Sequence, residues 1–201
     1  ACGDRMGMIW EKTWVVDVEG NGATPPEIVE IALLELVELR PTGREFHWLI
    51  KPEQPIAAVV TRIHGLSDDV VAGAPSIDDI ADDVVTWTDG CVIVGHNVRV
   101  ELDAISRSIP GWQPSAAIDT LKLARSLRPG LSSYSLENLG AALKLTTEAK
   151  RQTGLKHHSA QFDVALTALL FVELLGPLDR ADRDLRVREA DILFKSQESF
   201  L

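Results

Sequence analysis

The feature that most constrains this chain is a short apolar run that ends in two acidic residues. Residues 13–20, TWVVDVEG, are rich in β-branched and aromatic side chains and stop at a glycine, which predicts a buried strand followed by a turn. Because side chains alternate along a strand, Asp17 and Glu19 project from the same face. Two carboxylates at the end of a buried strand repel each other unless protons or a cation intervene. The pair therefore predicts a metal site, or, in the plainer interpretation, a solvated strand end.

Strand-like and helix-like segments alternate along the rest of the chain. Residues 27–39 fit either a helix or a long strand, and residues 46–52 predict a strand stopped by a proline, so we expect a meander of three strands. Helices are expected to start at Ser67 and to cover Ser76 to Trp87, the residues after Asn97, 132–145 and 157–175, with a strand at 91–97 and a strand leading into a helix at 117–127. This alternation is typical of an α/β domain with a central sheet flanked by helices.

Composition fits a single domain, placed at residues 8–178, followed by a charged extension at 179–201. With 45% hydrophobic and 25% charged residues, the chain resembles an ordinary soluble globule. No apolar stretch approaches the roughly 20 residues of a membrane span, and the first residues lack a signal-peptide pattern, so we expect a cytoplasmic protein with no membrane contact. The extension mixes charges with sparse aliphatic residues, which predicts a surface helix or a partner-binding segment.

The two cysteines, Cys2 and Cys91, are too few for a disulfide framework and lack the paired spacing of a zinc site. They favour a reducing compartment, with Cys91 as a core residue.

The formal net charge of −10 argues against a protein that coats nucleic acid by bulk electrostatics, since such binding depends on Lys and Arg neutralising phosphates. Any contact with nucleic acid must therefore be local. Bound metal ions would supply positive charge where a phosphate sits.

Two further motifs carry acids and histidines. The GHN motif at residues 95–97 lies between a predicted strand and helix, and Glu101 follows Asn97 by one helical turn, on the face that points back toward the strand end. Near the C-terminus, His158 precedes a predicted helix and Asp163 lies in its first turns. Each also has a plain interpretation: a surface acid, a hydrogen-bonded loop histidine, or a helix-dipole aspartate.

The order of these motifs resembles the DEDDh subgroup of the DnaQ-like 3′→5′ exonuclease superfamily, which has a ribonuclease H-like fold. The resemblance runs from about Thr13 to Leu175. It rests on three motifs, DVEGNG with PPEIVEIA, GHNVRVELDAI, and HSAQFDVALTALL, and on three connecting segments, TRIHGLSDDVV, IDTLKLARSL and YSLENLGAALKL. It implies a mixed central sheet flanked by helices in one domain.

The resemblance implies that Asp17, Glu19 and Asp163 are metal ligands and that His158, rather than the adjacent His157, is the general base. Glu101 departs from the family, whose second motif ends in Phe and Asp where this chain has Val100 and Glu101. Asp103 is two residues further along a helix, a rotation of about 200° that turns it away from the site. We therefore expect Glu101 to be the fourth ligand, directly or through water.

Four weaker site candidates are Gly20, Asn21, His64 and Asn97. The resemblance implies that Gly20 and Asn21 border the terminal nucleotide and that the segment around His64 faces the groove. His64 and Asn97 fit equally well as groups that stabilise loops.

The resemblance, together with these residues, implies an enzyme that removes nucleotides from the 3′ end of single-stranded DNA, RNA or a short oligonucleotide. Oxygen ligands suit two Mg²⁺ or Mn²⁺ ions. The alternative is a nucleic-acid-binding or scaffold module weakened by Glu101. DNA and RNA are not distinguished, and the sequence is compatible with a homodimer.

Overall fold

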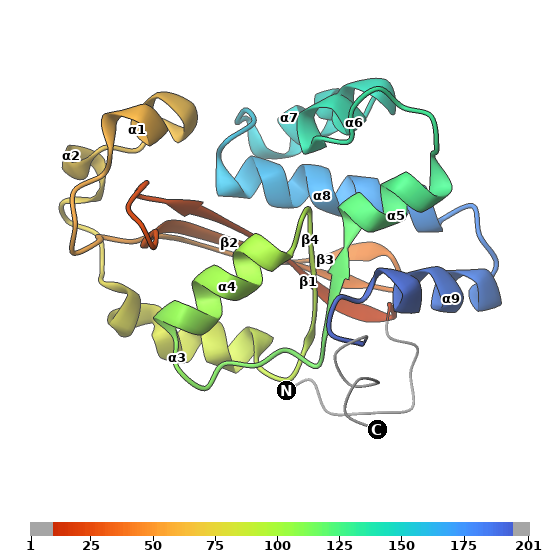
Figure 1. The fold of residues 1–201 in the computed structure, drawn as a ribbon, viewed down its shortest axis with the longest axis horizontal. Helices are drawn as coiled ribbons and strands as arrows, with labels where there is room; N and C mark the ends of the chain where they lie inside the picture. Colours follow the sequence, from red (N-terminus) through yellow and green to blue (C-terminus); the bar gives the residue numbers. More distant parts are fainter. Residues whose placement is uncertain (1–9, 195–201) are drawn as a thin grey trace.

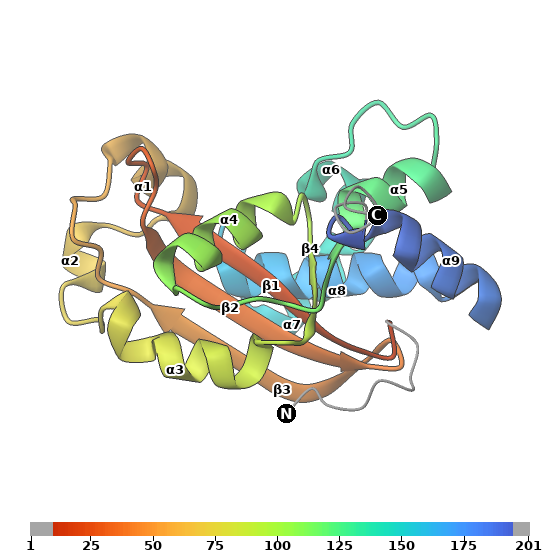
Figure 2. The ribbon, with the colours of Figure 1, turned by 60° about the horizontal axis from the view of Figure 1, so that its bottom comes forward.

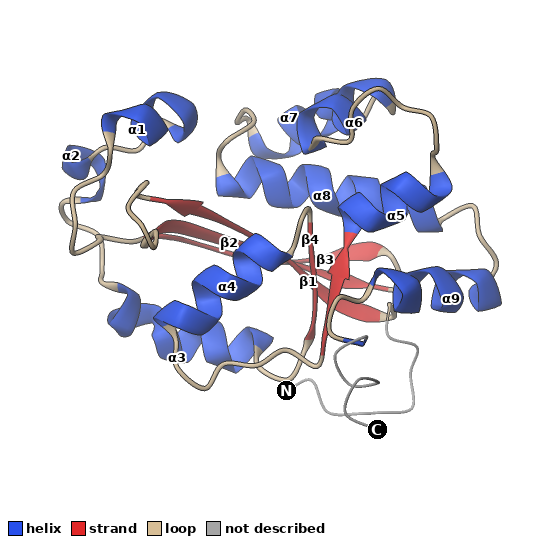
Figure 3. Cartoon of the chain, viewed as in Figure 1, coloured by secondary structure: helices blue, strands red, loops and turns tan. Residues whose placement is uncertain are grey.

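The computed structural model describes residues 10–194, in which the chain forms a five-stranded mixed sheet with helices on both faces (Figures 1 and 3). The strands are β1 (Lys12–Gly20), β2 (Ile28–Val37), β3 (Arg40–Leu49), β4 (Val92–Gly95) and β5 (Ala116–Asp119). Their order in the sheet is β3-β2-β1-β4-β5. The pairs β1–β2 and β2–β3 are antiparallel, whereas β4 runs parallel to β1 and β5 parallel to β4. The predicted α/β class and the three-stranded meander are confirmed.

The ambiguous segment after Glu27 forms strand β2, which helices cover on both faces of the sheet. Its residues are nearly all buried, as in the continuous apolar runs of sheet centres. Ala32 and Leu36 enter the core shared with α8 (Ala160–Leu175), while Ile31 and Leu33 enter the core shared with α3 (Ile77–Thr88) and α4 (Arg99–Ser108). A mixed pattern of acids and aliphatics left the helix alternative open, and the pairing with β1 and β3 excludes it.

Nine helices connect and cover the strands within the described residues. They are α1 (Ala58–His64), α2 (Asp68–Val71), α3 (Ile77–Thr88), α4 (Arg99–Ser108), α5 (Thr120–Leu127), α6 (Leu136–Ala142), α7 (Thr146–Thr153), α8 (Ala160–Leu175) and α9 (Arg180–Ala190). The predicted start at Ser76 is confirmed by a capping box with Asp79. No helix was expected at α7. Near Gly65 a helix was expected only after the glycine, whereas α1 ends there with Gly65 in the left-handed conformation that favours glycine.

Two layers of helices, one on each face of the sheet, bring distant segments of the chain to the same end of β1. On one face of the sheet α8 packs against β1 and β2, and on the other α3 and α4 cover the same strands (Figure 2). The helix α4 begins just after β4, which is parallel to β1, so its first turn lies near the carboxyl end of β1. Segments distant in sequence therefore meet at one end of the sheet.

The charged extension forms the expected helix, α9, and packs onto the domain. Val187 and Ala190 are buried in the core shared with α8. Beyond the helix, Asp191 Oδ1 accepts a hydrogen bond from the Ala117 amide at 3.0 Å, and the Ile192 amide donates to the Ala117 carbonyl at 2.9 Å. The segment thus covers the outer edge of β5, which would otherwise expose unpaired backbone groups.

No helix among residues 10–194 is long and apolar enough to cross a bilayer. Cys91 is buried in the core beside β4, as expected. It does not carry a free thiol, so the two cysteines do not support the expected reducing compartment. Residue spacing carries no information on this point, because a bond to sulfur depends on which segments fold side by side.

Candidate active site

Three carboxylates meet at the end of β1. Asp17 and Glu19 lie on the face of β1 that is turned toward α8, and Asp163 projects from the first turn of α8. One ligand oxygen from each lies within 4.8 Å of the others. The alternation of β1 and the start of α8 just before Asp163 explain this meeting, since both place the acids on facing surfaces. The structure therefore brings together three of the four predicted metal ligands in one group.

Glu101 approaches the same group from α4. It is only 4% exposed, and its Oε2 is a buried oxygen with no hydrogen-bond partner among the described residues. The sharp turn before α4 sets its position, because Asn97 adopts a positive φ of 64° and its amide donates to Asp119 Oδ1 at 2.9 Å. A buried carboxylate oxygen without a donor is costly unless a proton or a cation meets it. Asp103 is exposed on α4, and it lines a pocket that Glu19 and Gly20 also border.

The electrostatics show how closely these acids interact. Burial raises the pKa of Asp17 well above its usual range, and the charges of Glu101, Asp163, Glu19 and Glu30 raise it further. Burial, followed by the charges of Asp163 and Glu30, raises the pKa of Glu19 to about 7. Burial raises the pKa of Glu101 to about 8, with contributions from Asp119 and Glu19. A divalent cation coordinated by oxygen would remove this repulsion, so the donor set fits such an ion.

Both histidines of the third motif lie beside Asp163, but in different ways. His157 Nδ1 is 2.5 Å from Asp163 Oδ1, and this hydrogen bond raises the pKa of His157. The backbone amide of His158 donates to Asp163 Oδ2 at 3.1 Å, and His158 has a positive φ of 68°. Burial and the neighbouring His157 lower the pKa of His158. The ring in direct contact with the acid is therefore not the one that the family pattern names as the base.

The loop after β1 is organised by Asn21, whose side chain is fully buried. Its Oδ1 accepts hydrogen bonds from the amides of Ala23 at 3.0 Å and Glu27 at 2.9 Å, and its Nδ2 donates to the Gln54 carbonyl at 3.3 Å. Asn21 was predicted to border the substrate, but its side chain is engaged in holding this loop. Gly20, in contrast, lines an open pocket, and a Cβ at this position would come within 3.3 Å of Pro26.

His64, the last residue of α1, forms a hydrogen bond with the backbone of Gly20. Its Nδ1 accepts from the Leu66 amide at 3.0 Å, so the ring proton is on Nε2, which donates to the Gly20 carbonyl at 3.3 Å. Burial lowers the pKa of His64, which favours the neutral ring. Asn97 is exposed at the turn before α4. His64 thus borders Gly20, and Asn97 lies at the turn that carries Glu101 toward the acids.

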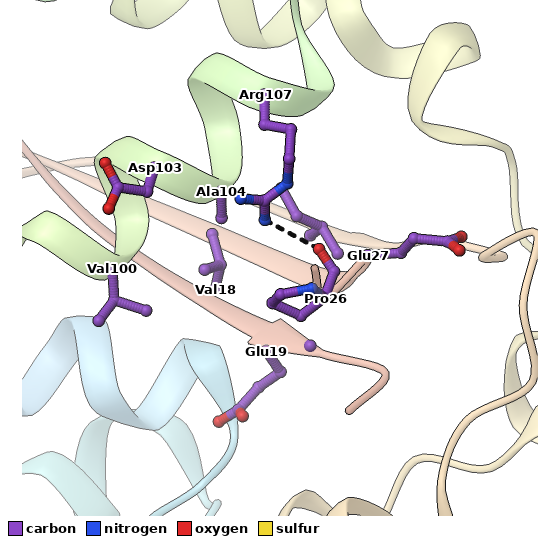
Figure 4. Close-up of a pocket in the computed structure, with 10 residues that line it drawn as sticks. Val18, Glu19, Pro26, Glu27, Val100, Asp103, Ala104 and Arg107 are labelled. Atoms are coloured by element: carbon purple, nitrogen blue, oxygen red, sulfur yellow. Dashed lines mark hydrogen bonds between the residues drawn. The ribbon is translucent and has the colours of Figure 1, made fainter. Parts of the chain in front are cut away.

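Sequence reasoning missed a pocket of about 300 Å³ between α4 and the loop after β1 (Figure 4). Glu19 and Gly20 form part of its wall, Val18, Val100 and Ala104 make it partly apolar, and Arg107 spans it to donate to the Pro26 carbonyl at 2.9 Å. Its walls come from segments far apart in the sequence, so no local pattern reveals it.

Sequence reasoning also assigned no role to Glu30, a buried acid on β2 that pairs with Glu19 across the strands. The antiparallel register of the expected meander is the signal that would have found it.

A family model described as "Exonuclease" matches residues 14–171, which include all four predicted ligands and both histidines. The chain belongs to the exonuclease family. The DNA polymerase III subunit epsilon of Rickettsia felis is 35% identical over 173 residues, covering 81% of this chain and 73% of that protein. The 3′→5′ exonuclease DinG of Bacillus subtilis is 29% identical over 82% of this chain, which corresponds to 18% of DinG.

The fold agrees with this family. The solved structure of exonuclease X in complex with 5′ overhanging duplex DNA superimposes with a TM-score of 0.69 and 26% identity, covering 87% of this chain and 99% of that one. The ribonuclease H-like fold is confirmed. This exonuclease is a DnaQ-like 3′→5′ enzyme, a hydrolase acting on phosphodiester bonds, in a family that generally uses divalent metal ions.

The raised pKa values predict an unusual dependence of stability on pH for the metal-free exonuclease. The pKa values of Glu19 and Glu101, about 7 and about 8, lie above their ordinary value of 4.5, so the folded state binds their protons more tightly than the unfolded state. Their stabilisation is complete below pH 4.5 and is lost as the pH rises to about 8. In chelator, the melting temperature of the parent should therefore fall more steeply across this range than that of Glu101→Gln, measured by calorimetry.

Mn²⁺ should raise the melting temperature of the parent more at pH 8 than at pH 5, because at low pH protons compete for the same oxygens.

In the metal-free experiment, parallel plots of melting temperature against pH for the parent and Glu101→Gln would show that Glu101 does not titrate in this range.

Proposed function

We propose that this exonuclease removes nucleoside 5′-monophosphates one at a time from the 3′ end of a DNA or RNA strand, with two Mg²⁺ or Mn²⁺ ions held by Asp17, Glu19, Glu101 and Asp163. The observation that supports this most is the cluster of carboxylate oxygens within 4.8 Å, together with the buried Oε2 of Glu101, which has no hydrogen-bond partner within residues 10–194. When bound, such ions lower the pKa of a water molecule and stabilise the charge that develops on the phosphate. An oxygen-rich set of ligands favours these two metals over zinc.

His158 takes the proton from the attacking water in this proposal. Its lowered pKa suits a base, because the neutral ring is the form that accepts a proton near neutral pH. In the structure His157 holds Asp163 Oδ1, and this oxygen becomes available to an ion only when His157 releases it. Both rings belong to the segment that follows Gly154, which ends α7 in the left-handed conformation. We also predict that residues 154–158 move before substrate binds, as the family resemblance implies.

Binding of a strand end fits the charge of the chain. Exonuclease X was solved with a duplex that has a 5′ overhang, and such a duplex offers a recessed 3′ end. Because its acidic residues outnumber its basic ones and give a net charge of −10, we propose that this exonuclease holds mainly the terminal nucleotides of a strand. The pocket beside Glu19 and Gly20, with apolar walls from Val18 and Val100, is suited to receive the terminal base.

The decisive experiment incubates 5′-labelled single-stranded DNA or RNA with the enzyme in Mn²⁺, Mg²⁺ or chelator. We expect a ladder of labelled products that shortens with time in metal, no products in chelator, and none with Asp17→Asn. Immediate release of a labelled mononucleotide would show the opposite polarity. Binding of both strands without hydrolysis in either metal would favour the binding module instead.

Glu101 provides the sharpest variant test. Glu101→Gln removes the charge but keeps the length, so activity should fall by orders of magnitude while the melting temperature in chelator at low pH is retained. Glu101→Asp restores the ligand of the family and should keep or raise activity. Equal rates for the parent, Gln and Asp forms, measured by single-turnover hydrolysis, would exclude Glu101 as a ligand.

The two histidines are separated by a matched pair of variants. His158→Ala should lower kcat by about 10²–10⁴-fold, the usual contribution of a general base, and leave Mn²⁺ affinity in place. His157→Ala should retain most of kcat and bind Mn²⁺ at least as well as the parent, because it frees Asp163 Oδ1. If His157→Ala is the inactive form, then His157 is the base; kcat and calorimetric Mn²⁺ binding decide between them.

A further inference from the structure

Glu30 joins three distant parts of the chain beside the acidic cluster. It is 4% exposed on β2, directly opposite Glu19 on β1. Its Oε1 lies 2.8 Å from His47 Nε2 on β3, and its Oε2 accepts a hydrogen bond at 3.2 Å from the backbone amide of Ala160, which is 130 residues away in sequence. Each carboxylate oxygen of Glu30 therefore has a partner, whereas Oε2 of Glu101 has none in the described part of the chain.

The contact with Ala160 lies at the beginning of α8. The first amides of a helix have no partner within the helix and normally receive a hydrogen bond from the side chain of the N-cap residue. Here the N-cap is Ser159, and its side chain makes no such bond. Glu30 supplies an acceptor from across the sheet, and its negative charge lies at the positive end of the helix dipole.

The position of α8 determines where Asp163 lies. Asp163 follows Ala160 by three residues, within the first turn of the helix, and its carboxylate must stay close to those of Asp17 and Glu19. The bond from Glu30 to Ala160 ties this turn to β2, while β2 pairs along its length with β1, which carries the other two acids. Through its hydrogen bonds, β2 thus connects the start of α8, which carries Asp163, with β1, which carries Asp17 and Glu19.

Electrostatics alone would disfavour an acid at this position. The charge of Glu30 raises the pKa values of both Asp17 and Glu19, so it adds to a repulsion that is already large. An apolar residue in the same place would avoid that repulsion and would leave the Ala160 amide without this acceptor. The geometry explains the acid, because its side chain gives the Ala160 amide at the start of α8 a hydrogen-bond acceptor from β2.

We propose that Glu30 is a positioning residue, which caps α8 through Ala160 and thereby fixes the spacing between Asp163 and the pair Asp17 and Glu19. The inference rests on the proposed function for its catalytic consequence. His47, whose side chain is 29% exposed, holds the other oxygen of Glu30 and keeps the carboxylate turned toward α8.

The test compares Glu30→Ala and Glu30→Gln with Leu36→Ala. Gln keeps an oxygen that can accept from Ala160, whereas Ala does not. Leu36 is fully buried on the same strand and pairs with Thr13, at the end of β1 remote from Asp17, so its truncation lowers stability without touching the start of α8. Three quantities are measured where every variant is folded: amide hydrogen exchange of residues 159–164 without metal, Mn²⁺ affinity, and kcat with KM.

Glu30→Ala should speed exchange at residues 159–164 and lower both kcat and Mn²⁺ affinity by about 10–100-fold, the usual effect of losing a group that orients metal ligands, with KM nearly unchanged. Glu30→Gln should stay close to the parent in exchange and within a few-fold in kcat. Leu36→Ala should lower the melting temperature but leave kcat and local exchange at the parent level. If Glu30→Ala does not fold, Glu30→Asp, one methylene too short to reach both partners, replaces it with the same expected direction.

Unchanged exchange at residues 159–164 in Glu30→Ala, or losses no larger than those of Leu36→Ala, would overturn the inference. Equal damage in Glu30→Gln and Glu30→Ala would also overturn it, because the charge and not the hydrogen bond would then matter. A parent without hydrolysis in any metal would contradict the proposed function, while the exchange comparison, which needs no activity, would still decide whether Glu30 caps α8.

Discussion

Mutual repulsion among buried carboxylates is the constraint around which one end of this domain is built. Asp17, Glu19 and Asp163 crowd their oxygens within 4.8 Å, and Glu101 is buried close enough for its charge to raise the pKa of Asp17. Such a group opposes folding unless protons or cations compensate it. The rest of the sheet and both helical layers must therefore supply the stability that this corner removes, which the two large apolar cores on either face of the sheet do.

The arrangement depends on connections between segments that are far apart in sequence. The parallel pairing of β4 with β1 brings the first turn of α4 to the end of β1, and the turn at Asn97, held by Asp119, directs Glu101 inward. On the opposite face, the packing of α8 on β1 and β2 delivers Asp163. Each acid is thus held by a different element, so the spacing of the cluster is a property of the whole sheet.

An acidic protein that acts on an acidic polymer needs positive charge only where the reaction occurs. The whole chain carries a net charge of −10, and the acids of the site form one local cluster that can bind cations. Metal ions bound there would reverse the sign of the potential at the scissile phosphate and leave the remaining surface repulsive to long strands. Family membership and this charge distribution are therefore compatible.

The sequence by itself determined the elements whose cause is local. The apolar run before Asp17, the Ser76 capping box and the apolar spacing after Asn97 are short-range patterns, and each formed the predicted strand or helix. The order of the motifs also indicated the family. Only the tertiary structure decided that residues 28–37 are a strand, that Asn21 is buried within its loop, that His157 contacts Asp163, and that Glu30 reaches Ala160. The reason is physical: periodicity and capping act between residues a few positions apart, whereas these contacts depend on the distance between segments that only the packed sheet brings together.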